Sequence, residues 1–515
     1  MEKLYNGIVL PEEWPPKNCP GQNGEGMPLP YLEKPPEVID ITVGRQLFVD
    51  SFLIESATMK PHWYQAQKYE NNPVLFPETP LERGERNYAL PEASAKSGGV
   101  WWDKRDKIYK MWYEAGWYQT YAYATSKDGL HWERPALDDG TNRILPNTQP
   151  DSNTVFIDES SEEQRYKLYS HGPNGNYAGF VATSKDGIHW ENYTITGSGQ
   201  GDRSTMFYNP FRKKWVFSIR SYYPGVGRCR DYYEFDRFLE DAPKSQDGQV
   251  FWMTTDRKDE PDPDYGLEPQ LYNVDAVGYE SIMLGLFQIF KGPENTDCEK
   301  TGIPKVTELQ TMFSRDGFHF SRPNRESFIT AGRKAGTWDR GYVQSIGGIC
   351  LIHGDELWFY YTGFAGDESN TFNGCWLANG MYANGSIGLA KLRRDGFVSM
   401  DAKEEPAELL TRQLVFCGDK CGLFVNVDSE HGELRCELLD DTGKAIPGFE
   451  MENSIALSVN STCARMQWKN QQDISALQGK TIRIRFAAKN TSLFAFWAGD
   501  EKGESGGFKA AGEIK

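Results

Sequence analysis

The sequence predicts an all-β protein, namely a five-bladed β-propeller followed by a C-terminal β-sandwich. Three observations support this prediction. A short motif recurs at nearly even spacing, each copy is preceded by strand-like segments rich in aromatic and β-branched residues, and the pattern changes near residue 402. Aromatic residues make up 13% of the 515 residues and 51 residues are glycine, which favours strands joined by tight turns over a helical bundle.

The repeated motif is Ser-x-Asp-Gly, followed by an apolar residue, His and an aromatic residue. Clear copies begin at Ser126, Ser184 and Ser314, a weaker copy is RRDGF at 393–397, and a degenerate candidate is SQDGQVFW at 245–252. Asp-Gly between apolar segments is typical of a tight turn, because Gly adopts positive φ and Asp bonds amides of its own turn. We interpret each copy as a hairpin tip that carries no chemistry.

Three strand-like segments precede each clear motif, and a fourth follows it. In the first unit the three are GGVWWD, IYKMWYEAG and TYAYATS, and in the second they are NTVFIDE, RYKLYSHG and AGFVATS. Four-stranded units at a nearly fixed period are typical of propeller blades. A closed ring of blades also removes exposed sheet edges, which favours a propeller over a long sandwich array.

The predicted domains are an N-terminal segment over 1–40, the propeller over 41–401 and the sandwich over 402–515. The first segment is Pro-rich and is expected to wrap the surface, and RQLFVDSFLIE at 45–55 is expected to open the propeller or close its ring. The last segment lacks the motif and alternates apolar with polar residues, as half-buried antiparallel strands do.

Charge and motifs argue against several classes of protein. The net charge of −17 disfavours nucleic acid and anionic membranes as partners. No apolar run is long enough to span a bilayer, the start lacks the pattern of a secretory signal, and the nine cysteines are scattered, so we expect a cytoplasmic protein. Seven dispersed His, without H-E-x-x-H or a phosphate loop, predict no metal and no cofactor.

Candidate functional residues lie where the innermost strand of each predicted blade begins. These strands line a central funnel, so side chains at their mouths converge. The carboxylates at these places are Glu92, Asp151, Asp202, Asp275 and Asp339, with Glu280 inside the fourth strand. Converging carboxylates repel one another, which leaves an acid beside a base. Cleavage of a glycosidic bond requires such a pair.

Aromatic residues and arginines fit a sugar site in the same funnel. Trp112 belongs to a first blade crowded with Trp and Tyr, whose rings can stack on sugars, although core packing between blades explains most of them. Arg203 lies near the third unit, where a cation can keep a carboxylate ionised or bind an acidic sugar. The expected partner is therefore a small carbohydrate, and the oligomeric state stays open.

The chain resembles the family 32 glycosidases (invertases and fructanases) and the related family 43 arabinofuranosidases and xylosidases. The resemblance covers roughly 40–515, and segments such as GRQLFVDSFLIE, GDRSTMFYNPFRKKWVFSIR and LWFYYTG are closest to poorly characterised bacterial family 32-like proteins. The resemblance implies catalytic acids in blades one, three and four. By position it implies Glu92 as the blade-one nucleophile, with Asp50 as a rival, and Asp202 as the transition-state stabiliser.

The acid motif of the family's fourth blade is absent as written. Glu280, Asp275 and Glu268 compete for this role, and Glu280 ranks first because YESIMLG places it on the innermost strand. The predicted function is therefore a glycoside hydrolase with the catalytic trio Glu92, Asp202 and Glu280. The expected substrate-binding residues are Asp50, Trp112, Asp151, Arg203, Asp275 and Asp339.

The expected substrates are short oligosaccharides or glycosides, with furanosides such as fructosides and arabinofuranosides favoured by the resemblance. Whether the anomer is retained or inverted stays open, because the separation of the carboxylates decides it. One alternative is a carbohydrate-binding propeller without catalysis. Another is a glycoside phosphorylase or lyase on the same scaffold, and phosphorolysis would require a cluster of Arg, Lys or His in the funnel.

Overall fold

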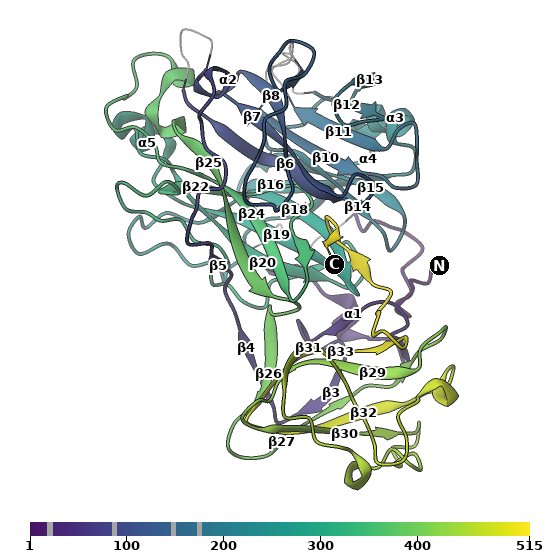
Figure 1. Cartoon of the computed structure of the whole chain (residues 1–515). Helices are drawn as coiled ribbons and strands as arrows, with labels where there is room; N and C mark the ends of the chain where they lie inside the picture. Colours follow the sequence, from purple (N-terminus) through teal and green to yellow (C-terminus); the bar gives the residue numbers. More distant parts are fainter. Residues whose placement is uncertain (18–23, 85–89, 146–150, 172–177, 515) are drawn as a thin grey trace.

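The computed structural model describes residues 1–17, 24–84, 90–145, 151–171 and 178–514. Figure 1 shows two bodies, a larger one built from the middle of the chain and a smaller one that contains most of the C-terminal part. In the described residues, five sheets form the larger body and two form the smaller one, while β1 (Ile39–Asp40) and β28 (Leu414–Val415) pair separately. The helices are short: α1 (Pro30–Glu33), α2 (Pro80–Arg83), α3 (Phe238–Asp241), α4 (Ser245–Gly248) and α5 (Asn295–Thr301).

The first three sheets each contain four consecutive strands in antiparallel order. The first contains β6 (Ala93–Asp103), β7 (Ile108–Ala115), β8 (Thr120–Ser126) and β9 (Arg143–Leu145). The second contains β10 (Ser152–Ile157), β11 (Tyr166–His171), β12 (Gly179–Ser184) and β13 (Trp190–Ile195). The third contains β14 (Thr205–Asn209), β15 (Lys214–Tyr223), β16 (Gly227–Phe235) and β17 (Val250–Met253).

The fourth and fifth sheets recruit strands from the ends of the chain. The fourth contains β18 (Gln270–Glu280), β19 (Ile282–Gly292), β20 (Val306–Ser314) and β21 (Phe320–Ser321), and β34 (Phe508–Lys509) pairs with β18. The fifth contains β22 (Gly341–Ser345), β23 (Leu351–His353), β24 (Glu356–Phe364) and β25 (Gly385–Arg393). Its outermost strand is β5 (Gln67–Lys68), and β35 (Glu513–Ile514) pairs with β23.

The innermost strands of the five sheets contact one another in a closed ring. β6 contacts β10, β10 contacts β14, β14 contacts β18, β18 contacts β22, and β22 contacts β6 again. This arrangement is a five-bladed propeller, and the N-terminal strand β5 completes its last blade. Closure of the ring pairs or covers the sheet edges that an open array would expose.

The clear copies of the repeated motif form hairpin tips. In the first copy, Ser126 Oγ accepts hydrogen bonds from the amides of Asp128 and Gly129. Asp128 Oδ1 accepts from the amides of Leu130 and His131, and the His131 Nδ1 atom lies 2.7 Å from Asp128 Oδ2. The copies over 184–190 and 314–320 repeat this network.

These tips also hold neighbouring blades together. Trp112 Nε1 donates a hydrogen bond of 2.7 Å to the carbonyl of Gly187, which lies in the tip of the next blade. Trp252 Nε1 of the third blade donates to the carbonyl of Phe318 at 2.8 Å. The repeated motif therefore has a structural role, because its own turn and its neighbours use its polar groups.

The prediction that the degenerate copy at 245–252 forms a hairpin tip is wrong. Its first four residues form α4, and β17 follows directly as the outer strand of the third blade. The copy at 393–397 is a turn in which Asp395 has φ of +60°. This turn leads from β25 into the smaller body, so the next strand, β26, is not a propeller strand.

The smaller body consists of two antiparallel sheets that face a shared core. One sheet contains β31 (Asn460–Arg465), β29 (Gly422–Asp428), β33 (Thr491–Gly499), β26 (Val398–Ala402) and β4 (Lys60–Trp63), with β2 (Gln46–Leu47) also on β33. The other contains β3 (Ile54–Ala57), β27 (Ala407–Thr411), β32 (Arg483–Lys489) and β30 (Glu433–Leu439). Phe48, Leu409, Val425, Phe486 and Phe496 belong to the core between them.

The sequence-based boundaries need correction at both ends. β2, β3 and β4 belong to the smaller body, so the segment 45–55 neither opens the propeller nor closes its ring. The chain returns to the propeller through β34 and β35, so the smaller body does not extend to residue 515. Alternation along a strand shows that it is half-buried but does not show which sheet it joins.

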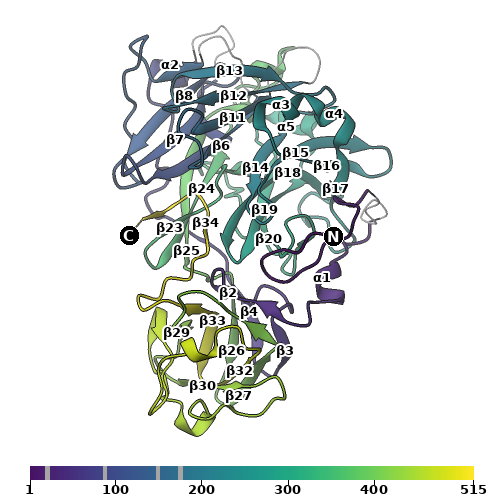
Figure 2. The ribbon, with the colours of Figure 1, turned by 90° about the vertical axis from the view of Figure 1, so that its right-hand side faces the viewer.

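The N-terminal segment lies against both bodies, as Figure 2 shows around α1. Leu4, Ile8 and Tyr31 pack into the core of the smaller body. On the propeller side, the Tyr5 hydroxyl donates to the carbonyl of Ser281 and the Asn6 amide to that of Arg315. The segment therefore fills the junction between the two bodies.

Candidate functional site

Acidic residues stand within three residues of the start of the innermost strand in four blades, as predicted. Glu92 precedes β6, Asp151 precedes β10, Asp202 precedes β14 and Asp339 precedes β22. The structure does not bring all four together. Glu92, Asp151 and Asp202 gather around the funnel, whereas Asp339 is held elsewhere in the fifth blade by Lys68 Nζ at 2.5 Å and the Tyr361 hydroxyl at 3.1 Å.

The centre of the cluster is an ammonium group shared by two carboxylates. Lys96 Nζ lies 2.9 Å from Glu92 Oε1 and 2.5 Å from Glu114 Oε2, and all three side chains are fully buried. The remaining oxygens, Glu92 Oε2 and Glu114 Oε1, have no hydrogen-bond partner among the described residues. One positive charge is therefore shared between two buried carboxyl groups, which favours a proton on one of them.

A bulge in β6 positions the ammonium group. The register between β6 and β7 is interrupted between Ser94 and Gly99, and Lys96 and Ser97 adopt positive φ of 36° and 70°. Non-glycine residues rarely adopt this conformation, and bulges of this kind re-aim side chains next to functional sites. Pairing of Ser94 with Glu114 then places both carboxylates beside Lys96.

The pKa values of two acids in the cluster are moved in opposite directions. Burial raises the pKa of Glu114 to about 7; the Glu92 carboxylate adds to this effect and Lys96 opposes it. Burial also acts to raise the pKa of Asp151, but the Arg203 guanidinium outweighs it and, with His171, lowers this pKa to about 2. At neutral pH the funnel therefore holds an ionised Asp151 and a Glu114 that can carry a proton.

Arg203 is the cation that acts on Asp151, as the sequence suggested. Its Nη2 atom lies 3.5 Å from Asp151 Oδ1, and its Nη1 atom also donates to the Asp151 carbonyl. His171 Nδ1 lies 3.7 Å from the other carboxylate oxygen. The Asp151 side chain is 16% exposed, so it faces solvent while it is held by these two partners.

Asp202 lies at the solvent side of the cluster. Its side chain is 45% exposed, and one carboxylate oxygen lies 3.1 Å from Arg220 Nη1. Aromatic rings border the same region: Trp117 and Tyr382 stack with centroids 4.2 Å apart, and Lys96 Nζ lies 3.9 Å from the Trp117 ring. Trp117 is buried between these two partners, whereas Tyr382 is partly exposed, so the Tyr382 ring suits the apolar face of a sugar.

Asp275 lies in the middle of β18, whereas the sequence suggested a place before the strand. Its carboxylate accepts hydrogen bonds from Ser97 Oγ at 3.0 Å, Asn273 Nδ2 at 3.1 Å and Ser345 Oγ. Burial raises its pKa, and the two serine hydroxyls oppose this rise. Asp275 therefore lies on the ring of innermost strands and contacts Ser97, the residue that follows Lys96 in the chain.

Glu280 does not join the cluster. It ends β18, which has 11 residues, so at about 3.3 Å per residue it lies roughly 30 Å from the start of the strand. Its carboxylate accepts from Ser505 Oγ at 2.6 Å and the Arg45 amide at 3.1 Å, and Arg394 Nη2 lies 3.0 Å away. Glu280 therefore ties the propeller to the smaller body. YESIMLG is a turn between β18 and β19 rather than one strand.

The remaining predicted residues lie outside the cluster. Asp50 pairs with Arg315 at 3.1 Å near the N-terminal segment. Trp112 is fully buried between the first two blades, which agrees with the alternative of core packing. Glu268 lines a polar surface hollow beside Glu260 and Arg257.

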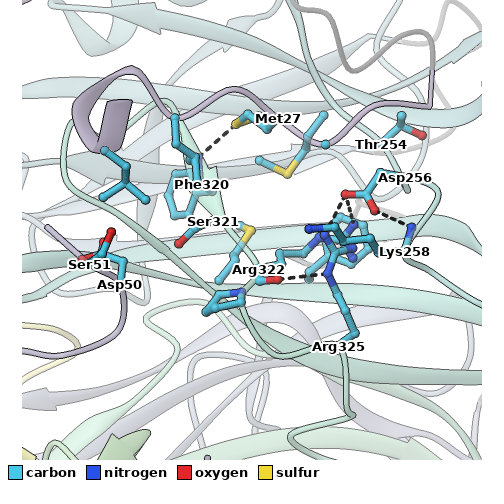
Figure 3. A pocket seen from close by; sticks show the side chains of 17 residues that line it. Met27, Asp50, Ser51, Thr254, Asp256, Lys258, Phe320, Ser321, Arg322 and Arg325 are labelled. Carbon is cyan, nitrogen blue, oxygen red and sulfur yellow. Dashed lines mark hydrogen bonds and ion pairs between the residues drawn. The ribbon is translucent and has the colours of Figure 1, made fainter. Parts of the chain in front are cut away.

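A separate pocket of about 340 Å³ lies between the N-terminal segment and the third and fourth blades (Figure 3). Met27 and Phe320 line one side, and Asp50 lies at its edge. Asp256 lies 3.3 Å from Arg322 Nη2 and 2.8 Å from Arg325 Nη2. These arginines outweigh burial and lower the pKa of Asp256, so this acid is ionised at neutral pH and does not suit the role of proton donor.

Sequence reasoning missed Glu114 and Lys96. Glu114 lies on the second strand of its blade, within YKMWYEAG, and Lys96 lies within ASAKSGG. A charged residue in each of two otherwise apolar, buried strands was the available signal, because such residues are rarely buried without a partner. Among the described residues, no group of His, Cys, Asp and Glu could hold a metal ion, and no helix is long and apolar enough to cross a membrane.

No protein-family model matches this chain, and no curated protein matches it. Solved structures do resemble it. A putative glycoside hydrolase from Bacteroides ovatus is 15% identical, with 63% of this chain and 96% of that chain covered and a TM-score of 0.39. The GH32 beta-fructofuranosidase of Bombyx mori is 9% identical, with 86% and 95% covered and a TM-score of 0.35.

A third similar structure is a family 43 arabinoxylan arabinofuranohydrolase from Bacillus subtilis in complex with cellotetraose. It is 10% identical, with 84% of this chain and 99% of that chain covered and a TM-score of 0.35. The families named here are those that the sequence resemblance indicated.

Proposed function

We propose that this protein is a glycoside hydrolase that uses Glu114 as proton donor and Asp151 as the ionised carboxylate. The observation that carries the proposal is the opposite shift of two acids that both interact with Arg203, with the pKa of Glu114 raised to about 7 and that of Asp151 lowered to about 2. Groups whose environments move their pKa values apart are suited to paired acid and base roles. Cleavage of a glycosidic bond needs both.

In this mechanism Glu114 protonates the leaving oxygen of the substrate. Glu92 keeps the Glu114 proton in place at neutral pH, because two carboxylates that share Lys96 resist ionising together. Asp151, held by Arg203, either attacks the anomeric carbon or activates water. The strained backbone of Lys96 supports a functional role for this cluster, because positive φ at a non-glycine residue costs stability.

The substrates proposed are short oligosaccharides and glycosides. Furanosides rank first, because the sequence resembles families that act on fructosides and arabinofuranosides. Tyr382, stacked on the buried Trp117, is partly exposed and presents a ring surface beside the acids. A carbohydrate-binding propeller would need these rings but would not need acids with opposed pKa shifts.

The test is hydrolysis of a panel of aryl glycosides and short oligosaccharides by wild type, Glu114→Gln and Asp151→Asn. The matched control is Glu308→Gln, because Glu308 is also a buried carboxylate beside an ammonium, 3.0 Å from Lys291 Nζ. Turnover that falls at least about 100-fold in the two site variants but not in the control supports the proposal. Saturable sugar binding without turnover of any member by wild type would refute it.

A further inference from the structure

Three cations near the funnel lack a carboxylate partner among the described residues. They are Lys305, Arg228 and Arg230, and all three contact Tyr272. The surrounding acids bind other cations: Glu92 and Glu114 bind Lys96, Asp151 binds Arg203 and Asp202 binds Arg220. A local excess of positive charge in a chain of net charge −17 requires an explanation.

Lys305 is the most constrained of the three cations. Its side chain is buried, and its Nζ atom donates to the Tyr272 hydroxyl at 3.2 Å. The rings of Tyr272, Tyr342 and Tyr382 surround it, with centroids 5.2, 5.4 and 5.7 Å from Nζ. An ammonium group has three donors, so two N–H groups of Lys305 have no partner among the described residues.

The two arginines flank the same tyrosine. Arg228 lies over the Tyr272 ring at 5.5 Å, and its Nη1 atom donates to Gln270 Oε1 at 2.6 Å. Arg230 is buried and donates to the carbonyls of Arg203, Ser218 and Tyr272. Each guanidinium is therefore oriented by neutral acceptors, and neither has a carboxylate at ion-pair distance among the described residues.

The tyrosine at the centre responds to this charge. Burial acts to raise the pKa of Tyr272, but Lys305 and Arg203 outweigh burial and lower this pKa to about 8. Tyr272 is still mostly protonated at neutral pH, so it does not neutralise Lys305. A buried ammonium without a counter-charge costs stability, and proteins rarely retain one without a ligand or a function.

We propose that Lys305, Arg228 and the Tyr272 hydroxyl form a subsite for an oxyanion carried by the ligand, a carboxylate or a phosphate. Lys and Arg donate charge-assisted hydrogen bonds to both groups. Arg228 and Tyr382 are partly exposed, which gives the subsite a side that faces solvent. The subsite rests on the proposed function, because it assumes a sugar substrate. It narrows that substrate to a sugar that carries a carboxylate or a phosphate group.

The position of the subsite fits this role. Tyr342 lies between the two charged groups, because Arg203 stacks on its ring at 5.6 Å and Lys305 lies over it at 5.4 Å. Arg203 in turn holds Asp151. An anionic group bound at Lys305 would therefore leave the rest of the ligand beside the acids of the proposed catalytic cluster.

The experiment measures binding of inorganic phosphate, glucuronate and glucose to the full chain by calorimetry, so it needs no turnover. We expect wild type to bind phosphate or glucuronate more tightly than glucose. Lys305→Met and Arg228→Gln are each expected to weaken anion binding about tenfold or more, since a charged hydrogen bond is lost. Preference for phosphate indicates a phosphate group in the ligand, and preference for glucuronate indicates an acidic sugar.

The control is Lys291→Met, which removes a lysine that is paired with Glu308. We expect it to leave anion binding unchanged and to lower the melting temperature. Lys305→Met should not lower the melting temperature without ligand, because it removes an unpaired buried charge. The subsite is overturned if wild type binds neither anion, or if Lys305→Met binds the anion as tightly as wild type does. Anion binding without hydrolysis of any glycoside overturns the proposed function and leaves the subsite standing.

Discussion

Substitution of Glu114 by Gln is expected to change stability in a pH-dependent way. Glu114 has its pKa raised from 4.5 to about 7, chiefly by burial. Because the folded state binds this proton more tightly than the unfolded state, the wild-type carboxyl costs no stability below pH 4.5 and an increasing amount as pH rises to about 7. At 1.36 kcal/mol for each pKa unit, the full cost above pH 7 is about 3 kcal/mol.

Glutamine is neutral at every pH, so the variant escapes this cost. We expect the free energy of unfolding of Glu114→Gln, relative to wild type, to be between about 2 and 3 kcal/mol higher at pH 8 than at pH 5, because part of the cost is already present at pH 5. Urea unfolding at the two pH values measures this difference.

The control for this measurement is Glu308→Gln. The pKa of Glu308 is lowered, because Lys291, Ser327 and Arg333 outweigh the effect of burial. Its stabilisation is therefore present above pH 4.5 and is lost only as pH falls further, so Glu308→Gln should lose a similar amount at pH 5 and pH 8. A Glu114→Gln variant that behaves like this control would refute a proton on Glu114 near neutral pH.

Three further predictions concern the site and the junctions between its parts. The kcat/KM of wild type should fall as pH rises through about 7, because Glu114 then loses its proton. On the acidic limb kcat/KM should stay constant until the pH approaches 2, where Asp151 becomes protonated. A pH–rate profile measures both limbs. Glu280→Gln should lower the free energy of unfolding by about 3 kcal/mol, since it removes the buried carboxylate that pairs with Arg45 and Arg394, while kcat of the folded protein stays unchanged; a large loss of kcat with the fold intact would restore Glu280 to the catalytic trio. Trp112→Phe should cost about 1 kcal/mol from the lost bond to Gly187, read as a lower melting temperature with substrate KM unchanged.

The propeller was predictable from sequence because its signals are local. Each clear copy of the motif contains all the groups that form its turn within a few residues. In the first copy the Gly129 amide donates to Ser126 Oγ and the His131 amide donates to Asp128 Oδ1. The pairing partners of short strands were not predictable in this way. β5 closes the fifth blade although it is more than 300 residues away from β25, and β2 to β4 join the smaller body instead.

The candidate site was predictable in part for the same reason. Glu92 and Asp151 stand before innermost strands, which is a positional signal in the chain. Glu114 reaches the cluster because of its register opposite Ser94, and register is not visible in the sequence of one strand. Glu280 was misplaced because its turn, with φ of +47°, lacks the Gly, Asn or Pro that usually indicates one.

The most direct test of the proposed chemistry compares two leaving groups on one sugar. A general acid matters most when the leaving oxygen is strongly basic and least when it is already a good leaving group. For Glu114→Gln we predict a loss of kcat of about 100-fold or more on a phenyl glycoside and a much smaller loss on the dinitrophenyl glycoside of the same sugar. Equal losses on both substrates, or no loss on either, would contradict the assignment of Glu114 as the proton donor.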